Sequence, residues 1–248
     1  MSEAGIAVYG FDAHGHGKSD PAAKSERAYI EAFQHLVDDY EEVIDGVIRG
    51  TGTGAAAAPP HAPSFVGGQS MGGLVAAHVA LQSQERFAGL LLHSPALDVE
   101  WTPMLRIQAQ MGGLLAALAP HGRLVPAVRP EDMSQDPEVV RAYMEDPLNT
   151  QGNICARSGN ELLKAFRQLG SRASQLKLPL YIGHGDQDKC TSLPASARFV
   201  EAVSSPDATL HVYKGGYHEL LHGPEWQDAT DRMIEWMTKR SGQGRSKL

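Results

Sequence analysis

The chain has 248 residues, of which 42% are hydrophobic and 21% are charged, as in ordinary globular domains. Its 22 Lys and Arg against 29 Asp and Glu give a net charge of −7, which argues against a nucleic-acid partner. Cys155 and Cys190 have no metal or redox spacing. With no apolar run of roughly 18 residues and no signal-peptide pattern, the sequence predicts one soluble, unsecreted domain in a reducing compartment.

The first part of the chain contains strand and helix signals in alternation. Residues 6–11, "IAVYGF", predict a buried strand, and an apolar residue every three or four positions predicts an amphipathic helix from about 27 to 49. The Gly, Ala and Pro content of residues 50–63 predicts a surface excursion. Residues 64–69 then predict a second strand, and a helix of small residues follows from residue 71.

Three more strands are predicted downstream, at residues 87–94, 178–185 and 209–215. Strands that alternate with helices in this way indicate a mostly parallel α/β sheet, here of five strands. Residues 97–175 are too long and too helical for one crossover connection. We therefore expect them to form a helical cap over the ends of the strands.

Within that cap, three helices are predicted. Apolar residues line one face of the first, at 104–118, which could be the entrance for an acyl chain or a face packed on the sheet. Asp136-Pro137-Glu138 is typical of the start of a second helix, and Asn160 is expected to cap a third.

The segment "GGQSMGG", residues 67–73, places Ser70 between a predicted strand and a predicted helix. A bare G-x-S-x-G pattern is weak, since about 0.2 matches are expected by chance in a chain of this composition. Its position between strand and helix is what indicates a nucleophile elbow, a sharp turn for which Gly68 and Gly72 make room. The alternative is a serine that caps a helix after an ordinary turn.

A serine nucleophile needs a base and an acid that orients the base. Asp188 follows the predicted strand 178–185, and His218 follows the last strand, which is the chain order of the α/β-hydrolase fold. Asp186 is a rival acid and His222 a neighbouring histidine. Either carboxylate could instead cap a turn, and His218 could be an ordinary loop residue.

Taken together, four segments resemble the monoacylglycerol lipase branch of the α/β-hydrolase superfamily over almost the entire sequence. They are "FDAHGHGKSD", "GGQSMGG", "GHGDQDKCT" and "YKGGYHELLH". The resemblance implies Ser70 as nucleophile, His218 as base, Asp188 as acid and the Met71 backbone N–H as one oxyanion donor. It implies no cofactor and no metal, and makes the histidines of the first segment ordinary loop residues.

The chain departs from the family at its start. In the family three strands precede the one predicted at residues 6–11, and an H-G-x-G loop after the third supplies a second oxyanion N–H. Without them we expect either a gap inside the sheet or a sheet that has closed up, and a polypeptide that is poorly active or unstable by itself. The sequence also allows that the chain is a fragment.

The resemblance predicts a hydrolase of monoacylglycerols or similar lipophilic esters, with transient contact of the cap with a membrane surface. A lysophospholipid or a hydroxycinnamoyl ester is an alternative substrate, and a non-catalytic relative that binds a lipid or a partner is an alternative of another class. The last three residues, Ser246-Lys247-Leu248, spell a peroxisomal address, which predicts an import receptor as partner in a eukaryote and a cytoplasmic location otherwise.

Overall fold

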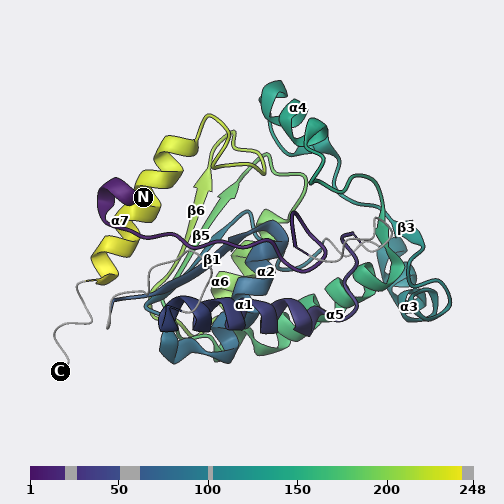
Figure 1. Ribbon diagram of the computed structural model, residues 1–248, viewed down its shortest axis with the longest axis horizontal. Helices are drawn as coiled ribbons and strands as arrows, with labels where there is room; N and C mark the ends of the chain where they lie inside the picture. The colour runs from purple at the N-terminus through teal and green to yellow at the C-terminus, as the bar shows by residue number, and fades with distance from the viewer. Residues whose placement is uncertain (20–26, 51–61, 100–102, 242–248) are drawn as a thin grey trace.

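The computed structural model describes residues 1–19, 27–50, 62–99 and 103–241. Its centre is a sheet of four parallel strands (Figure 1). They lie in the order β1 (Phe65–Gln69), β2 (Gly89–His93), β5 (Leu180–Gly185) and β6 (Ala208–Tyr213). The predicted α/β architecture is confirmed, with the last four of the five predicted strands in place.

The expected strand at residues 6–11 does not form, because this segment pairs with no described strand. Its side chains remain accessible, with Val8 71% exposed and Tyr9 41% exposed. An apolar run becomes a strand only where a neighbour accepts and donates its backbone hydrogen bonds. The sheet therefore ends at β1, and its four strands are continuous, without the internal gap that was one of the expectations.

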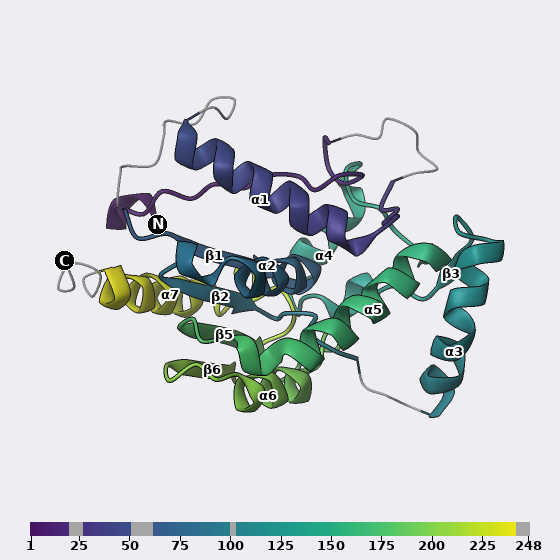
Figure 2. The same ribbon diagram turned by 90° about the horizontal axis from the view of Figure 1, so that it is seen from below.

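Both faces of the sheet are covered by helices (Figure 2). Helices α1 (Phe33–Arg49), α2 (Ser70–Gln82), α5 (Ala156–Arg172) and α6 (Leu193–Ala202) supply side chains to the main core on one face, and α7 (Trp226–Ser241) covers the other. Successive side chains of a strand point to opposite faces of the sheet, so a strand supplies side chains to the core on each face. Leu90, Leu92 and Ile182 belong to the main core on the side of α2, α5 and α6, whereas Leu91 and Tyr181 pack with Trp236 of α7.

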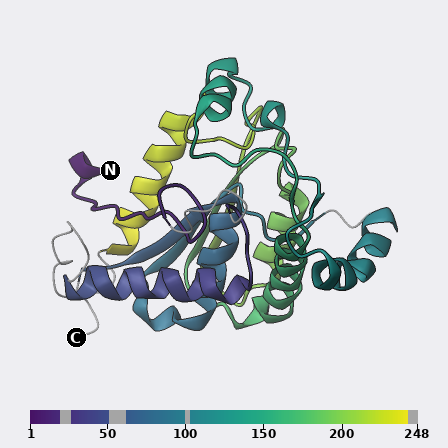
Figure 3. The same ribbon diagram turned by 45° about the vertical axis from the view of Figure 1, so that its right-hand side comes forward.

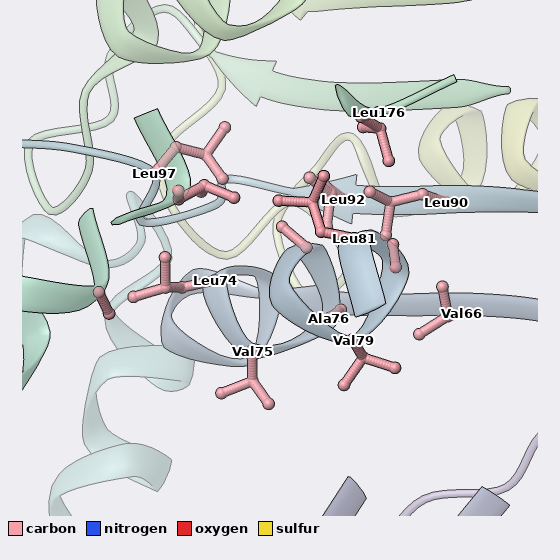
Figure 4. Packing of buried hydrophobic residues seen from close by; sticks show 14 of the residues in the cluster. Val66, Leu74, Val75, Ala76, Val79, Leu81, Leu90, Leu92, Leu97 and Leu176 are labelled. Atoms are coloured by element: carbon pink, nitrogen blue, oxygen red, sulfur yellow. The ribbon is translucent and has the colours of Figure 1, made fainter. Parts of the chain in front are cut away.

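The small residues predicted after the elbow let α2 lie close to the sheet. Ala76, Ala77 and Val79 are fully buried, and Figure 4 shows the side of α2 that faces Leu90 and Leu92. Burial of this kind stabilises by roughly 25 cal/mol per Å² of apolar surface. The core therefore fixes the first turn of α2, where Ser70 lies, against the ends of the central strands.

The segment between β2 and β5 contains the three helices predicted there, α3 (Pro103–Leu118), α4 (Pro137–Glu145) and α5. It also contains elements that were not predicted, a two-stranded antiparallel sheet of β3 (Arg123–Val125) and β4 (Ile154–Cys155) and the 3₁₀ turn η4 (Pro130–Asp132). Further 3₁₀ turns are η1 (Ser2–Ala4), η3 (Gln84–Arg86) and η5 (Ala173–Gln175). Asp136 does cap α4, since its carboxylate accepts from the Glu138 N–H at 2.9 Å. Asn160 is not a cap, because α5 begins four residues earlier at Ala156.

Helix α4 lies beyond the carboxyl ends of the strands (Figures 1 and 3). Helix α5, in contrast, contributes Ala165, Phe166 and Leu169 to the main core, so it belongs to the layer that covers the sheet. In the C-terminal half of α3 the predicted apolar face is not packed against the sheet, since Leu114 and Leu118 are 59% and 75% exposed, whereas Met104, Leu105 and Ile107 of the same face lie outside the described side chains. Residues 97–175 remain our proposed cap region.

None of the helices in the described ranges is both long and apolar enough to cross a bilayer. Most of the low-complexity segment 50–63 and the C-terminal Ser246-Lys247-Leu248 lie outside the described residues.

Candidate active site

Ser70 occupies the turn between β1 and α2, as the sequence predicts. Its φ of 52° lies in the left-handed region, which is strained for a residue with a side chain. Gly68 makes this turn possible, because a Cβ there would collide with the Gly72 carbonyl. Gly72 itself faces open space, and the second close contact occurs at Gly73, where a Cβ would lie 2.9 Å from Pro95. The expected role of Gly68 is confirmed, while the role expected of Gly72 belongs to Gly73.

Replacing Gly68 with alanine is expected to lower the free energy of unfolding by about 3 kcal/mol, because the new methyl group meets backbone that cannot rotate away. The matched control is Gly72→Ala, which adds the same methyl group to open space within a helix and is expected to be neutral or stabilising by about 1 kcal/mol. Urea denaturation measures both values. Equal values for the two variants would contradict this account of the turn.

Asp188 and His218 come together at the carboxyl ends of β5 and β6. The Asp188 Oδ2 lies 2.9 Å from the His218 Nδ1, and both side chains are buried, with 0% and 3% exposed. The loops can approach because Gly185, at the end of β5, has no Cβ to collide with the Gly216 carbonyl. The two distant segments that the sequence pairs are thus joined by a hydrogen bond.

The Asp188 carboxylate is surrounded by donors. Oδ1 accepts from the backbone N–H groups of Cys190 at 2.7 Å and Thr191 at 3.0 Å, and Oδ2 lies 2.7 Å from the Thr191 hydroxyl. Burial by itself would raise the pKa of Asp188, but hydrogen bonds from His184, His218 and Thr191 outweigh it and hold the pKa well below its usual range. Asp188 is therefore ionised and able to orient an imidazole near neutral pH.

The two rival residues occupy ordinary positions. The Asp186 Oδ1 accepts from the Gly215 N–H at 2.8 Å, which is the turn-capping role. The His222 side chain is 66% exposed and pairs with Glu219. The geometry therefore favours Asp188 over Asp186 and His218 over His222.

Ser70 and His218 belong to neighbouring segments. The side-chain amide of Gln69 donates to the His218 carbonyl at 3.4 Å, which links the end of β1 to the histidine loop. Within the described ranges no hydrogen bond joins the Ser70 hydroxyl to the His218 ring. In enzymes without substrate such bonds are often long and tighten only in the complex.

Cys190 lies beside the acid and histidine, and its ligand atom is within 4.8 Å of theirs. Burial raises the pKa of its thiol to about 12, with the carboxylates of Asp188, Asp132 and Glu219 adding to the effect. Metals bind the thiolate, and the other two groups are already bonded to each other. This trio therefore does not fit a metal site.

The same thiol is expected to resist alkylation. At pH 8 a pKa of about 12 leaves a thiolate fraction more than about a thousandfold below that of a free cysteine, so iodoacetamide should label Cys190 that much more slowly. Peptide mass spectrometry over time measures the rate, and the urea-denatured chain, with both cysteines accessible, is the control. Rapid labelling of folded protein at Cys190 would contradict the expectation.

A cavity of about 390 Å³ lies between α4 and the histidine loop. Its walls include the apolar side chains of Met133, Val139 and Val140, and Glu219 and His222 line it on the loop side. An apolar cavity beside a polar loop is suited to an amphiphilic ligand. It directly adjoins the residue after His218.

Two residues that the sequence reasoning did not single out also contact Asp188. The His184 Nε2 lies 3.3 Å from the Asp188 Oδ2, and the Thr191 hydroxyl lies closer still. The available signal was local, since both lie within four residues of Asp188 in "GHGDQDKCT".

Comparison with known proteins gives the site a family context. The family model described as "Serine aminopeptidase, S33" matches residues 1–225. A monoacylglycerol lipase from Mycolicibacterium smegmatis is 30% identical over 236 residues, which is 94% of this chain and 79% of that protein. A caffeoylshikimate esterase from Arabidopsis thaliana is 26% identical over 97% of this chain and 71% of its own length.

Among solved structures, that of Paleococcus ferrophilus monoacylglycerol lipase superposes with a TM-score of 0.77 at 28% identity, covering 96% of this chain and 85% of that one. These relatives support carboxylic ester hydrolysis as the class of reaction. The chain therefore belongs to the serine aminopeptidase S33 family of α/β-hydrolases, and within it is similar to the monoacylglycerol lipases.

Proposed function

We propose that the chain hydrolyses lipophilic carboxylic esters with Ser70 as nucleophile, His218 as general base and Asp188 as the acid that orients it. The observation that carries the proposal is the buried 2.9 Å contact between Asp188 and His218, in loops that also meet the strained turn of Ser70. A bonded acid and histidine beside a half-buried elbow serine is the arrangement that acyl transfer requires.

In the proposed reaction His218 accepts the Ser70 proton as the serine oxygen attacks the ester carbonyl. The Nδ1–H of His218 faces Asp188, so the other ring nitrogen is the one that accepts the proton. The proton then passes to the departing alcohol, which leaves an acyl-serine that water hydrolyses by the reverse proton transfers. The Met71 N–H, in the first turn of α2 where amides lack intrahelical acceptors, donates to the developing oxyanion.

For the substrate, we propose a monoacylglycerol or a related long-chain ester. The names of the Mycolicibacterium and Paleococcus relatives support it, and so do the apolar walls of the cavity beside the histidine loop. Similarity to the caffeoylshikimate esterase favours a second candidate, a hydroxycinnamoyl ester.

A fluorophosphonate probe and an ester panel test the proposal. We expect covalent labelling at Ser70 that His218→Ala abolishes, and hydrolysis of monoacylglycerols faster than of hydroxycinnamoyl esters or lysophospholipids. Preference for the aromatic esters would support the second candidate substrate. Absence of both labelling and turnover in a protein shown to be folded by circular dichroism would refute the catalytic proposal.

A further inference from the structure

Asp188 is flanked by two histidines, and the second of them, His184, lies in the interior. Its side chain is 0% exposed at the end of β5, and its Nε2 is 3.3 Å from the Asp188 Oδ2, the same oxygen that His218 contacts. The other ring nitrogen, Nδ1, is 2.9 Å from the hydroxyl of Ser196 in α6, which is also fully buried. A buried imidazole with a polar partner on each nitrogen is held in one orientation.

The partners determine where the protons of this network lie. Asp188 is ionised, so the His184 Nε2 carries the proton and presents its N–H to the Asp188 Oδ2 and the Thr191 hydroxyl oxygen, each at 3.3 Å. In a neutral ring the Nδ1 then accepts, and the Ser196 hydroxyl donates to it. The Thr191 hydroxyl lies 3.3 Å from the same Nε2. It has one proton to donate, and the Asp188 Oδ2 at 2.7 Å is a closer acceptor for it than the Ser94 carbonyl at 3.1 Å.

We propose that His184 is a positioning residue. It donates a hydrogen bond to the Asp188 Oδ2, the oxygen that His218 also contacts, and so holds the carboxylate in place and weakens the attraction of Asp188 for His218. The inference rests on the proposed function, because it assigns His184 a part in setting the pH at which His218 works as a base. No step of bond making passes through His184.

The direction of its effect follows from charge. Each donor to Oδ2 withdraws negative charge that would otherwise stabilise the protonated form of His218. Removing the His184 donor therefore makes Asp188 a stronger partner for the imidazolium, and the acid limb of the pH profile should move upward. Cys190 lies beside the pair, and the titratable groups that interact with it from elements packed nearby, Tyr143 of α4, Asp132 of η4 and Glu219, stay in place.

The test compares His184→Phe with His184→Gln by the pH profile of kcat/KM on a soluble p-nitrophenyl ester. The phenyl ring fills the space without a donor, so the acid limb is expected to move upward by about one pH unit, the worth of one hydrogen bond to a charged group. The glutamine amide can donate from nearly the position of Nε2, and its limb is expected to stay near that of the wild type. His184→Asn, which is too short to reach Oδ2, replaces the Phe variant if that one does not fold.

The matched control is His78→Phe. His78 is also a buried histidine with one hydrogen bond, to the Ala165 carbonyl at 3.1 Å, but it lies in the core between α2 and α5. This substitution is expected to lower stability and leave the acid limb in place. If His184→Phe behaves in the same way, or if the Gln variant shifts as far as the Phe variant, the proposal is overturned.

NMR titration of the His218 ring reads the same shift without turnover. An upward shift in the Phe variant supports the action of His184 on Asp188, and an unmoved titration overturns it. Failure of the wild type to hydrolyse esters or to label at Ser70 would instead count against the proposed function, so the two failures are distinguishable.

Discussion

Ser70→Ala is expected to lower kcat for ester hydrolysis by about 10⁵-fold, to the residual rate that substrate binding and the oxyanion donor alone support. The reason is that the strained turn presents this hydroxyl, and no neighbouring residue in the turn, "GGQSMGG", offers another nucleophile. His218→Ala is expected to lower kcat by a similar factor, since the hydroxyl then keeps its proton near neutral pH.

The double variant is the sharper measurement. Because Ser70 and His218 act in the same step, Ser70→Ala/His218→Ala should be no slower than either single variant. Losses that multiply would show that the two residues act independently and would contradict the proposed reaction. Ser83→Ala is the matched control, since Ser83 lies at the opposite end of α2, where its hydroxyl donates to Glu41, and kcat should stay within about twofold of the wild type.

The site could be predicted from the sequence because its residues occupy fixed places relative to strands. Ser70, Asp188 and His218 each lie within five residues of the carboxyl end of a strand, and parallel strands bring these ends to one edge of a sheet. The sequence pattern that identified them is local, so wrong predictions for other segments of the chain do not affect it. Their catalytic roles remain our proposal.

The errors occurred where structure depends on a partner distant in the sequence. Residues 6–11 have a strand pattern, yet a strand needs a hydrogen-bonded neighbour, and local sequence does not reveal whether one is present. The apolar side of α3 was recognisable, but whether it would be buried was not, and Leu114 and Leu118 are exposed. His184 was missed because a histidine inside a strand is usually a packed core residue, and only the contact with Asp188 distinguishes it.

Asp188→Asn is expected to lower kcat by about 10⁴-fold. The amide has nearly the shape of the carboxylate, but one of its two ends donates and cannot accept. Oδ1 accepts two backbone N–H groups and Oδ2 accepts from His218 and the Thr191 hydroxyl, so either orientation of the amide places donors against donors. His218 then loses the partner that holds its Nδ1–H, and with it the orientation that leaves the other nitrogen free to accept from Ser70.

The same substitution has a signature in the pH dependence of stability. The pKa of Asp188 is lowered in the folded protein, so folding favours the ionised carboxylate, and this contribution is fully present above the unfolded value of about 3.9. It is lost as the pH falls below that value toward the folded pKa. The difference in free energy of unfolding between wild type and Asp188→Asn should therefore shrink as the pH falls below 4, as measured by urea denaturation at each pH.

Asp186→Asn separates this effect from a general loss of charge. Asp186 lies in the same loop but caps the Gly215 N–H from an exposed position, so its substitution should leave kcat nearly unchanged. A difference between wild type and Asp188→Asn that stays constant down to pH 2 would mean that Asp188 is not held ionised by His218, His184 and Thr191. Donors that do not favour the ionised carboxylate could not hold Asp188 and His218 together as assigned, so that result would also count against the proposed reaction, independently of any rate measurement.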